Sequence, residues 1–172
     1  MDNSILLKII KSIEEANEFV YISVPWWWSD TVGEKICKAL HDAKKRGVNI
    51  NVELRPTVQN KRIRQKLVNF DTEITENVKL HMKIVCSEKE YSLTTANFHN
   101  KDMLINDNQI EQFKDKERIK NYIDAFESRK QKKIRTFDGP EIESKASDLI
   151  DDFNILNLIK SLIGEKKLNP LQ

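Results

Sequence analysis

Hydrophobic residues along the first half of the chain switch repeatedly between helical and strand spacing. From Ser4 to Ala16 the apolar residues recur every three or four positions behind a possible serine cap, and the same period returns from Thr31 to Arg46, with Gly47 as a stop signal. Between them, Phe19 to Val24 is a continuous apolar run, which is typical of a buried central strand. Val48 to Leu54 alternates apolar and polar residues, which predicts a strand with one face in water. Helix, strand, helix, strand in this order predicts the beginning of an α/β sheet with right-handed crossovers.

The second half of the chain favours further elements of both kinds. A third helix is expected from Val58 to Phe70, and the strands Val78 to Cys86 and Tyr91 to Ala96 are expected to form a β-hairpin around a polar turn. Ile110 to Phe113 has the length and composition of one more strand. Asp115 to Arg129 gathers its apolar residues on one helical face. The expected fold class is therefore α/β, with a mixed β-sheet flanked by helices.

A domain boundary is expected near Gly139-Pro140, because this dipeptide interrupts the helical pattern. Residues 1–137 would form the main domain, and residues 138–172 a C-terminal helical extension. Within this extension, Ile142 to Ile163 has apolar residues at helical spacing. So short a segment cannot bury a core of its own, and we expect it to dock on the main domain or on a partner chain.

Composition and charge limit the classes of function. The chain has 172 residues, of which 39% are hydrophobic and 33% charged, as expected of a globular protein with charged, exposed helices. Its net charge of +2 gives only a weak preference for anionic partners, so any contact with nucleic acid must come from local clusters. Cys37 and Cys86 lack metal-site spacing and are expected to be buried. No apolar stretch approaches the ~18 residues that span a bilayer, and the first residues lack a basic leader. We expect a cytoplasmic protein without stable membrane association.

Four polar residues of the predicted hairpin are candidates for chemistry. His81 and Lys83 are two positions apart, so their side chains would leave one strand on the same face. Thr95 and Asn97 have the same parity at the end of the next strand. Together they would offer a phosphodiester a nucleophile, a cation and neutral hydrogen-bond donors. On the pattern alone the alternative stays open, namely a half-buried strand whose polar face points to water.

A wider pattern around these residues resembles a known family. His81-Met82-Lys83, four residues, Glu88, a short turn and Thr94-Thr95-Ala96-Asn97 are similar to the phospholipase D superfamily motif, in which His-x-Lys, four residues and Asp precede Gly-Ser-x-Asn. The strand ending at Pro25 and the helix ending in Ala43-Lys44-Lys45-Arg46-Gly47 resemble the first half of that family's domain. The resemblance covers roughly residues 5 to 130.

The resemblance assigns a role to each candidate. His81 would be the nucleophile that forms a phosphohistidine, and Lys83, Asn97 and Thr95 would hold the phosphate. The family uses neither a metal nor another cofactor. Its active site is built from two such motifs, and members with a single motif form homodimers. One motif in this chain therefore implies a homodimer in which the partner's His81 protonates the leaving oxygen.

Three departures from the family motif support a second hypothesis. Glu88 replaces Asp, and the hairpin is one residue shorter than usual, so that Ser87 is a competing match. Thr94-Thr95 replaces Gly-Ser, which keeps a hydroxyl but adds a Cβ where the backbone approaches the phosphate. Asn108 stands where related nucleases carry a Glu that orients the histidine, and its carbonyl could fix an imidazole tautomer but not stabilise the imidazolium as a carboxylate does. The second hypothesis is a catalytically decayed module that binds nucleic acid or mediates dimerisation.

Aromatic residues near the expected site are candidates for substrate binding. Trp26-Trp27-Trp28 follows the first strand, at the strand end where α/β proteins place their ligands. Trp26 and Trp27 could form a platform for a base or a lipid glycerol region, but core or interface packing is the alternative, because three consecutive rings cannot all face one way. His99, just after Asn97, could reach the substrate or simply lie in a loop.

Two basic clusters favour a polyanionic substrate. Lys61, Arg62 and Arg64 lie in the third predicted helix, and Arg129 to Arg135 forms the second cluster. Each could contact phosphates, or could simply be a solvated surface. Because both flank the motif and no membrane-binding segment is visible, a nuclease acting on DNA rather than RNA is favoured over a lipase.

Overall fold

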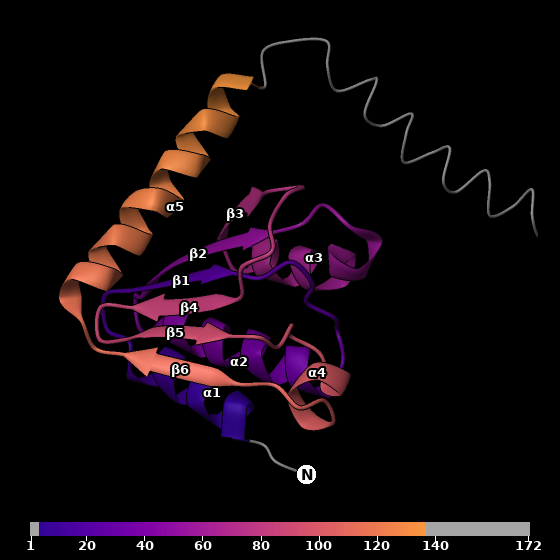
Figure 1. Ribbon diagram of the computed structural model, residues 1–172. Coiled ribbons are helices and arrows are strands. Elements are labelled where there is room, and N and C mark those ends of the chain that lie inside the picture. Colours follow the sequence, from indigo (N-terminus) through magenta and orange to yellow (C-terminus); the bar gives the residue numbers. More distant parts are fainter. Residues whose placement is uncertain (1–3, 137–172) are drawn as a thin grey trace, which may run out of the picture. The chain divides into compact units, whose positions relative to one another are not determined.

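The sheet has three parallel and three antiparallel strands. The computed structural model describes residues 4–136, and in that range six strands lie in the order β3-β2-β1-β4-β5-β6 (Figure 1). Strands β1, β2 and β3 pair in parallel, whereas β4, β5 and β6 continue the sheet in antiparallel pairs. The strand bounds are β1 Phe19–Ser23, β2 Asn49–Leu54, β3 Glu73–Glu76, β4 Ile84–Ser87, β5 Tyr91–Thr94 and β6 Ile110–Phe113. The expected mixed sheet is confirmed.

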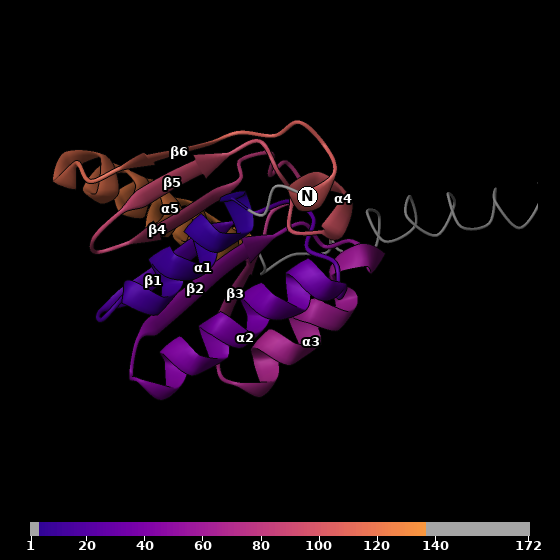
Figure 2. The ribbon, with the colours of Figure 1, turned by 90° about the horizontal axis from the view of Figure 1, so that it is seen from below.

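Helices cover both faces of this sheet. Figure 2 shows α1, α2 and α3 together on one face, where they enclose the larger apolar core. On the opposite face, Ile119, Tyr122 and Phe126 of α5 pack against Tyr21, Ile84 and Cys86. The helices are α1 Ser4–Glu15, α2 Thr31–Lys45, the short 3-10 helix η1 Val58–Asn60, α3 Lys61–Asn69, α4 Asn100–Leu104 and α5 Lys116–Thr136.

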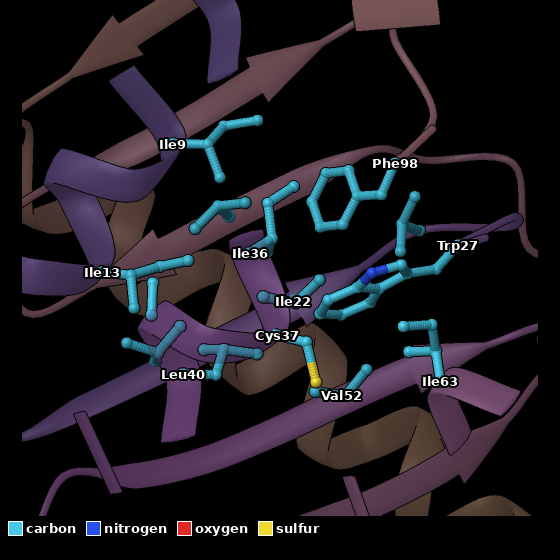
Figure 3. Packing of buried hydrophobic residues seen from close by; sticks show 14 of the residues in the cluster. Ile9, Ile13, Ile22, Trp27, Ile36, Cys37, Leu40, Val52, Ile63 and Phe98 are labelled. Atoms are coloured by element: carbon cyan, nitrogen blue, oxygen red, sulfur yellow. The ribbon is translucent and has the colours of Figure 1, made fainter. Parts of the chain in front are cut away.

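The main core ends in an aromatic pair close to the strand termini. Figure 3 shows Trp27 and Phe98 beside the aliphatic side chains of the sheet and helices. Both residues are fully buried, and their rings meet edge to face with centroids 5.0 Å apart. One residue comes from the loop after β1 and the other from the loop after β5. The core therefore fixes these two loops beside each other.

The prediction that β2 has one face in water is wrong. Its first residue, Asn49, is exposed, but its other polar residues, Asn51 and Glu53, are buried. Glu53 accepts hydrogen bonds from Ser23 Oγ and Asn77 Nδ2, both at 2.8 Å, and Ser23 Oγ also lies 2.8 Å from the hydroxyl of Tyr122 on α5. The Glu53 carboxylate is thus paired within the protein, as burial of a carboxylate requires.

The hairpin strands are shorter than predicted, and one strand was missed. The first hairpin strand begins at Ile84 and not at Val78, and β3 precedes it. Asn77 ends β3 with a turn, because its side chain accepts from Lys79 N at 3.0 Å and its carbonyl from Leu80 N at 3.1 Å. Val78 is exposed, and Leu80 is the only buried residue of the turn 77–80.

The last helix that the structure describes is longer than predicted. Helix α5 continues to Thr136, seven residues beyond its predicted end at Arg129. Among residues 4–136, no helix is both long and apolar enough to cross a membrane. The predicted helix at 142–163 falls outside the described residues, so the division into 1–137 and 138–172 stays a prediction.

Candidate active site

Three loops meet where β1 and β5 end and β4 begins. Ser23 of β1 pairs with Ile84 of β4, and the Lys83 carbonyl accepts from Thr94 N of β5 at 3.0 Å. The loop after β1 is joined to the loop after β5 by two backbone hydrogen bonds of 3.0 Å, from Trp28 N to Phe98 O and from Phe98 N to Trp26 O. The sheet topology therefore brings residues 81–83, 95–99 and 26–28 to one edge.

Lys83 supplies a buried cation at this edge. Its residue is only 8% exposed, and its Nζ donates to the His81 carbonyl at 3.0 Å. Burial lowers the pKa of the Lys83 ammonium, the Asp102 carboxylate acts against this, and the positive charge of Arg55 adds to the lowering. Within the described residues no carboxylate lies close enough to Lys83 for a salt bridge. Its charge therefore remains available to a bound anion.

Asp102 organises the residues around Asn97. Its Oδ2 accepts from Asn97 N at 3.0 Å and from Asn97 Nδ2 at 2.8 Å, and lies 3.3 Å from His99 Nε2. Its Oδ1 accepts from Asn106 Nδ2 at 2.8 Å. Burial would raise the pKa of this carboxyl, but the bonds from Asn97, the nearby His99 and Asn106 outweigh it and lower the pKa below its ordinary value.

The Asn97 side chain retains an unsatisfied acceptor. Its Nδ2 is committed to Asp102, whereas its Oδ1 is buried and has no hydrogen-bond partner. Such an atom is costly unless something donates to it. A protonated imidazole, a water or a substrate hydroxyl could be this donor.

His81 is exposed beside Lys83. No hydrogen bond or ion pair among the described residues orients its imidazole. Asn108, proposed for that task, instead accepts from Thr95 Oγ1 at 2.7 Å and donates to the Asp102 carbonyl at 2.7 Å. The Thr95 hydroxyl also accepts from Gln109 N at 3.0 Å. Asn108 and Thr95 are thus close to the site but occupied with each other.

Glu88 does not join the site. It lies in the β4–β5 turn, at the opposite end of these strands, where its carboxylate accepts from Asn17 N at 2.8 Å and Phe19 N at 3.4 Å. Burial tends to raise its pKa, but these backbone N–H groups outweigh that effect and lower it. Its inclusion among the catalytic residues is corrected: Glu88 fastens the hairpin turn to the connection between α1 and β1.

The three tryptophans occupy different environments. Trp27 is fully buried and its Nε1 donates to the Gly33 carbonyl at 3.0 Å, so its prediction as a substrate-binding residue is wrong. Trp26 is half-buried, with the Arg55 guanidinium 4.9 Å from its ring centroid. Trp28 is 46% exposed and stacks on His99 with ring centroids 4.9 Å apart. Trp28 is therefore the ring of this run that is presented to solvent.

The basic cluster of α3 is divided. Arg64 forms an ion pair with Glu76 at 2.9 Å, whereas Lys61 and Arg62 line a pocket together with Trp28. Arg64 is thereby partly neutralised and turned toward β3, which weakens its assignment to substrate binding. Lys61 and Arg62 remain candidates.

Two residues that the sequence patterns did not indicate belong to this edge. Asp102 lies in the first turn of α4, where His99 caps the helix, and its spacing from Asn97 matches no part of the family motif quoted above. Arg55 follows β2 and donates from Nε to the Leu80 carbonyl at 2.6 Å. The only sequence signal for Arg55 as a site residue was its position just after a parallel strand, at the carboxyl end where α/β proteins bind ligands.

Comparisons with known proteins identify the family. Residues 9–130 match the family described as "Cardiolipin synthase, PLD-like domain". The chain belongs to this phospholipase D-like family. The expected superfamily membership is thus confirmed, and the match covers the whole of the edge described above. Comparison with curated protein sequences finds no match.

Several solved structures have the same fold. Nuc from Salmonella typhimurium, a phospholipase D family member, superposes with a TM-score of 0.64 at 15% identity, over 73% of this chain and 86% of Nuc. NucT from Helicobacter pylori gives a TM-score of 0.60 at 16% identity, over 73% of this chain and 87% of NucT. The archaeal chromatin protein TrmBL2, described as having a novel mode of DNA binding, gives 0.53 at 18% identity, over 73% of this chain and 48% of TrmBL2.

Proposed function

We propose that this phospholipase D-like protein is a metal-independent phosphodiesterase, and that it acts as a nuclease on DNA in the cytoplasm. The observation that carries the proposal is the buried Lys83 ammonium, which donates to the carbonyl of the exposed His81 and has no salt-bridge partner among the described residues. A buried cation without a counter-ion is unfavourable in the empty site and becomes favourable when a phosphate binds. Family membership supports the same chemistry.

The proposed reaction has two displacements at a site shared by two protomers. His81 attacks phosphorus, the P–O bond to the leaving group breaks, and the partner's His81 gives its proton to the leaving oxygen. Water then attacks the phosphohistidine, the partner's His81 removes a proton from the water, and the N–P bond breaks. Lys83 stabilises the charge on the non-bridging oxygens in both steps. The protein would therefore be a homodimer at working concentrations.

A polynucleotide is the substrate class that the surroundings favour. Lys61 and Arg62 flank the edge with two cations that lack ion-pair partners in the described part of the chain. Phosphate contacts of this kind supply most of the sequence-independent affinity for DNA. The similarity of the fold to Nuc, to NucT and to a DNA-binding archaeal protein is compatible with this choice.

The test is DNA cleavage by the full chain in the presence of EDTA, on single-stranded and double-stranded substrates. Wild-type protein should cleave, and His81→Ala should abolish cleavage because it removes both the nucleophile and the acid. His41→Ala is the matched control, since His41 lies on α2 against Phe70 and away from the motif. Equal activity of wild type and His81→Ala would refute the proposed mechanism.

Mixed dimers test whether the site is shared. A dimer of one wild-type and one His81→Ala chain should be inactive on ordinary DNA, because a nucleophile then has no acid. It should still react with bis-p-nitrophenyl phosphate, whose leaving group needs no proton, and leave a phosphohistidine that acid quenching traps. A mixed dimer that cleaves DNA at half the wild-type rate would show two independent sites.

A decayed binding module is the second candidate. The observation in its favour is that Asn108 replaces the expected carboxylate and contacts Thr95 and Asp102 instead of the His81 imidazole. In this case the protein would bind DNA without cleaving it or bis-p-nitrophenyl phosphate, and His81→Ala would leave its affinity unchanged. The cleavage experiment above separates the two candidates.

A further inference from the structure

A pocket of about 460 Å³ opens beside the motif, between the loop that enters α2 and the start of α3. Its volume falls in the range of small-molecule sites. The walls combine one aromatic ring, two cationic side chains and apolar and amide groups. The lining residues include Trp28, Asp30, Lys61 and Arg62.

The basic side chains of α3 near this pocket differ in whether they form ion pairs. Arg64 and Lys66 on the same helix are ion-paired, with Glu76 at 2.9 Å and with Glu34 at 2.5 Å. Lys61 and Arg62 have no such partner in the part of the chain that the structure describes. The cations that face the pocket are thus the unpaired ones of the helix.

The carboxylate that lines the pocket is engaged elsewhere. Asp30 caps α2, and its Oδ1 accepts from Gly33 N at 3.0 Å. Its Oδ2 accepts from Asn100 N at 2.7 Å. Asp30 forms no ion pair with either cation among the described residues, and two cations against one carboxylate leave the pocket lining a formal charge of +1, which favours an anion.

Trp28 connects the pocket to the motif. Its exposed ring stacks on His99, which lies 3.3 Å from Asp102, and Asp102 in turn holds Asn97. The backbone keeps Trp28 in place: its N–H donates to Phe98 O, and a Cβ at Gly33 would come within 1.8 Å of the Trp28 carbonyl. The Trp28 backbone is therefore held in place, and its exposed ring is linked through His99 and Asp102 to Asn97 of the motif.

We propose that this pocket binds one unpaired nucleotide of a single strand, next to the phosphate that is cleaved. The base would stack on the free face of Trp28, extending the stack that begins at His99, and the adjoining phosphate would lie between Lys61 and Arg62. A base inside a duplex is already stacked and cannot present its face to a ring. The substrate class is thus single-stranded nucleic acid, or a single-stranded segment next to a duplex. The location beside a scissile phosphate rests on the proposed function, whereas binding to the pocket does not.

The experiment measures the affinity of the full chain for a fluorescein-labelled oligothymidylate, in EDTA, by fluorescence anisotropy. His81→Ala serves as the background, so that no strand is cleaved. Trp28→Ala should weaken binding about tenfold, as the loss of one base stack does. The same oligonucleotide paired with its complement should bind weakly and should not respond to Trp28→Ala.

An abasic scan identifies the contact itself. An abasic residue is placed at each position of the strand in turn. At one position the affinity of the protein with Trp28 intact should fall about tenfold. With the abasic residue at that position, Trp28→Ala should cause no further loss of affinity. Trp28→Leu, which keeps apolar bulk without the ring, should behave like Trp28→Ala and guards against an effect on folding. The proposal would be overturned if the effects of the abasic residue and of Trp28→Ala on affinity were additive at every position. It would also be overturned if Trp28→Leu left the affinity unchanged.

The phosphate contact has its own test. The double variant Lys61→Gln with Arg62→Gln should reduce the slope of log affinity against log salt by about one to two units. The control removes the same charge from α2, with Lys38→Gln and Lys45→Gln, and should leave the slope unchanged. Equal slopes for both double variants would overturn the assignment of these cations. If wild-type protein binds the oligonucleotide without cleaving it, the proposed nuclease activity is refuted, but the proposed binding of a nucleotide in the pocket is not.

Discussion

Replacing Lys83 by Met should inactivate the protein without destabilising it. The buried ammonium makes one hydrogen bond, to the His81 carbonyl at 3.0 Å, which is worth about 1.5–3 kcal/mol for a charged donor. Against this, burial of an ion costs several kcal/mol even after the protein relaxes. Met has a similar length and is apolar. We therefore expect the free energy of unfolding to be unchanged or to rise by up to about 2 kcal/mol, which raises Tm by up to about 8 °C.

The rate should change far more than the stability. Loss of a group that stabilises transition-state charge costs about 10²- to 10³-fold in kcat. Turnover of bis-p-nitrophenyl phosphate and urea unfolding, followed by circular dichroism, measure the two quantities on the same preparations. Lys79→Met is the control, because Lys79 is exposed and nearby; it should change stability by less than about 0.5 kcal/mol and retain activity.

The pH dependence gives a stricter test. The pKa of Lys83 is lowered in the folded protein, so the unfolded state binds this proton more tightly. Below the folded-state pKa, the penalty for the charged form is present in full; it is relieved as pH rises toward the ordinary value of about 10.4. The stability advantage of Lys83→Met should therefore be largest at neutral pH and shrink as pH rises. A variant that is less stable at neutral pH, or an advantage independent of pH, would refute the reasoning.

Three further predictions concern the residues around the site. Asp102→Asn should destabilise the protein by about 1–3 kcal/mol at neutral pH, and because the pKa of Asp102 is lowered, urea unfolding should show the difference from wild type disappearing as pH falls below about 4. Asn60→Ala should lower the free energy of unfolding by about 3 kcal/mol, since it leaves three backbone groups unpaired, two of them buried, whereas exposed Asn69→Ala should have little effect in the same measurement. In DNA-binding titrations, Arg62→Gln should weaken affinity and reduce the slope of log affinity against log salt by about one unit. Arg64→Gln, which removes an ion-paired cation, should change affinity and slope less. The reverse order would show that Arg62 and the pocket do not bind the DNA phosphates.

The hydrophobic pattern was sufficient for most helices and strands because their core contacts are periodic. It failed for β2 because the alternation that indicates water equally suits a strand whose polar side chains are bonded to buried partners, here Ser23 and Asn77 on Glu53. It extended the first hairpin strand too far because the Asn77 turn depends on one side chain and not on periodicity.

Only part of the candidate site could be predicted from the sequence. The motif gave the order of His81, Lys83 and Asn97, and the antiparallel hairpin brings the last two to one edge. Asp102 could not be found in this way, because its role depends on how α4 turns after β5. Glu88 was misplaced because its spacing follows the motif, while the length of the strand carries it to the far end of the hairpin.

The link between Trp27 and the two loops affects how the site can move. Ligand-binding loops usually open independently of the domain, at a small fraction of its total stability. Here Trp28 and Phe98 are bonded to each other's loops, and Trp27 between them is fully buried and bonded to Asn60. Releasing this edge would pull the Trp27 indole out of the core, at a cost of about 3–5 kcal/mol. The site is consequently preorganised: the entropy of arranging it is lost when the chain folds, and a substrate meets a surface that is already in place.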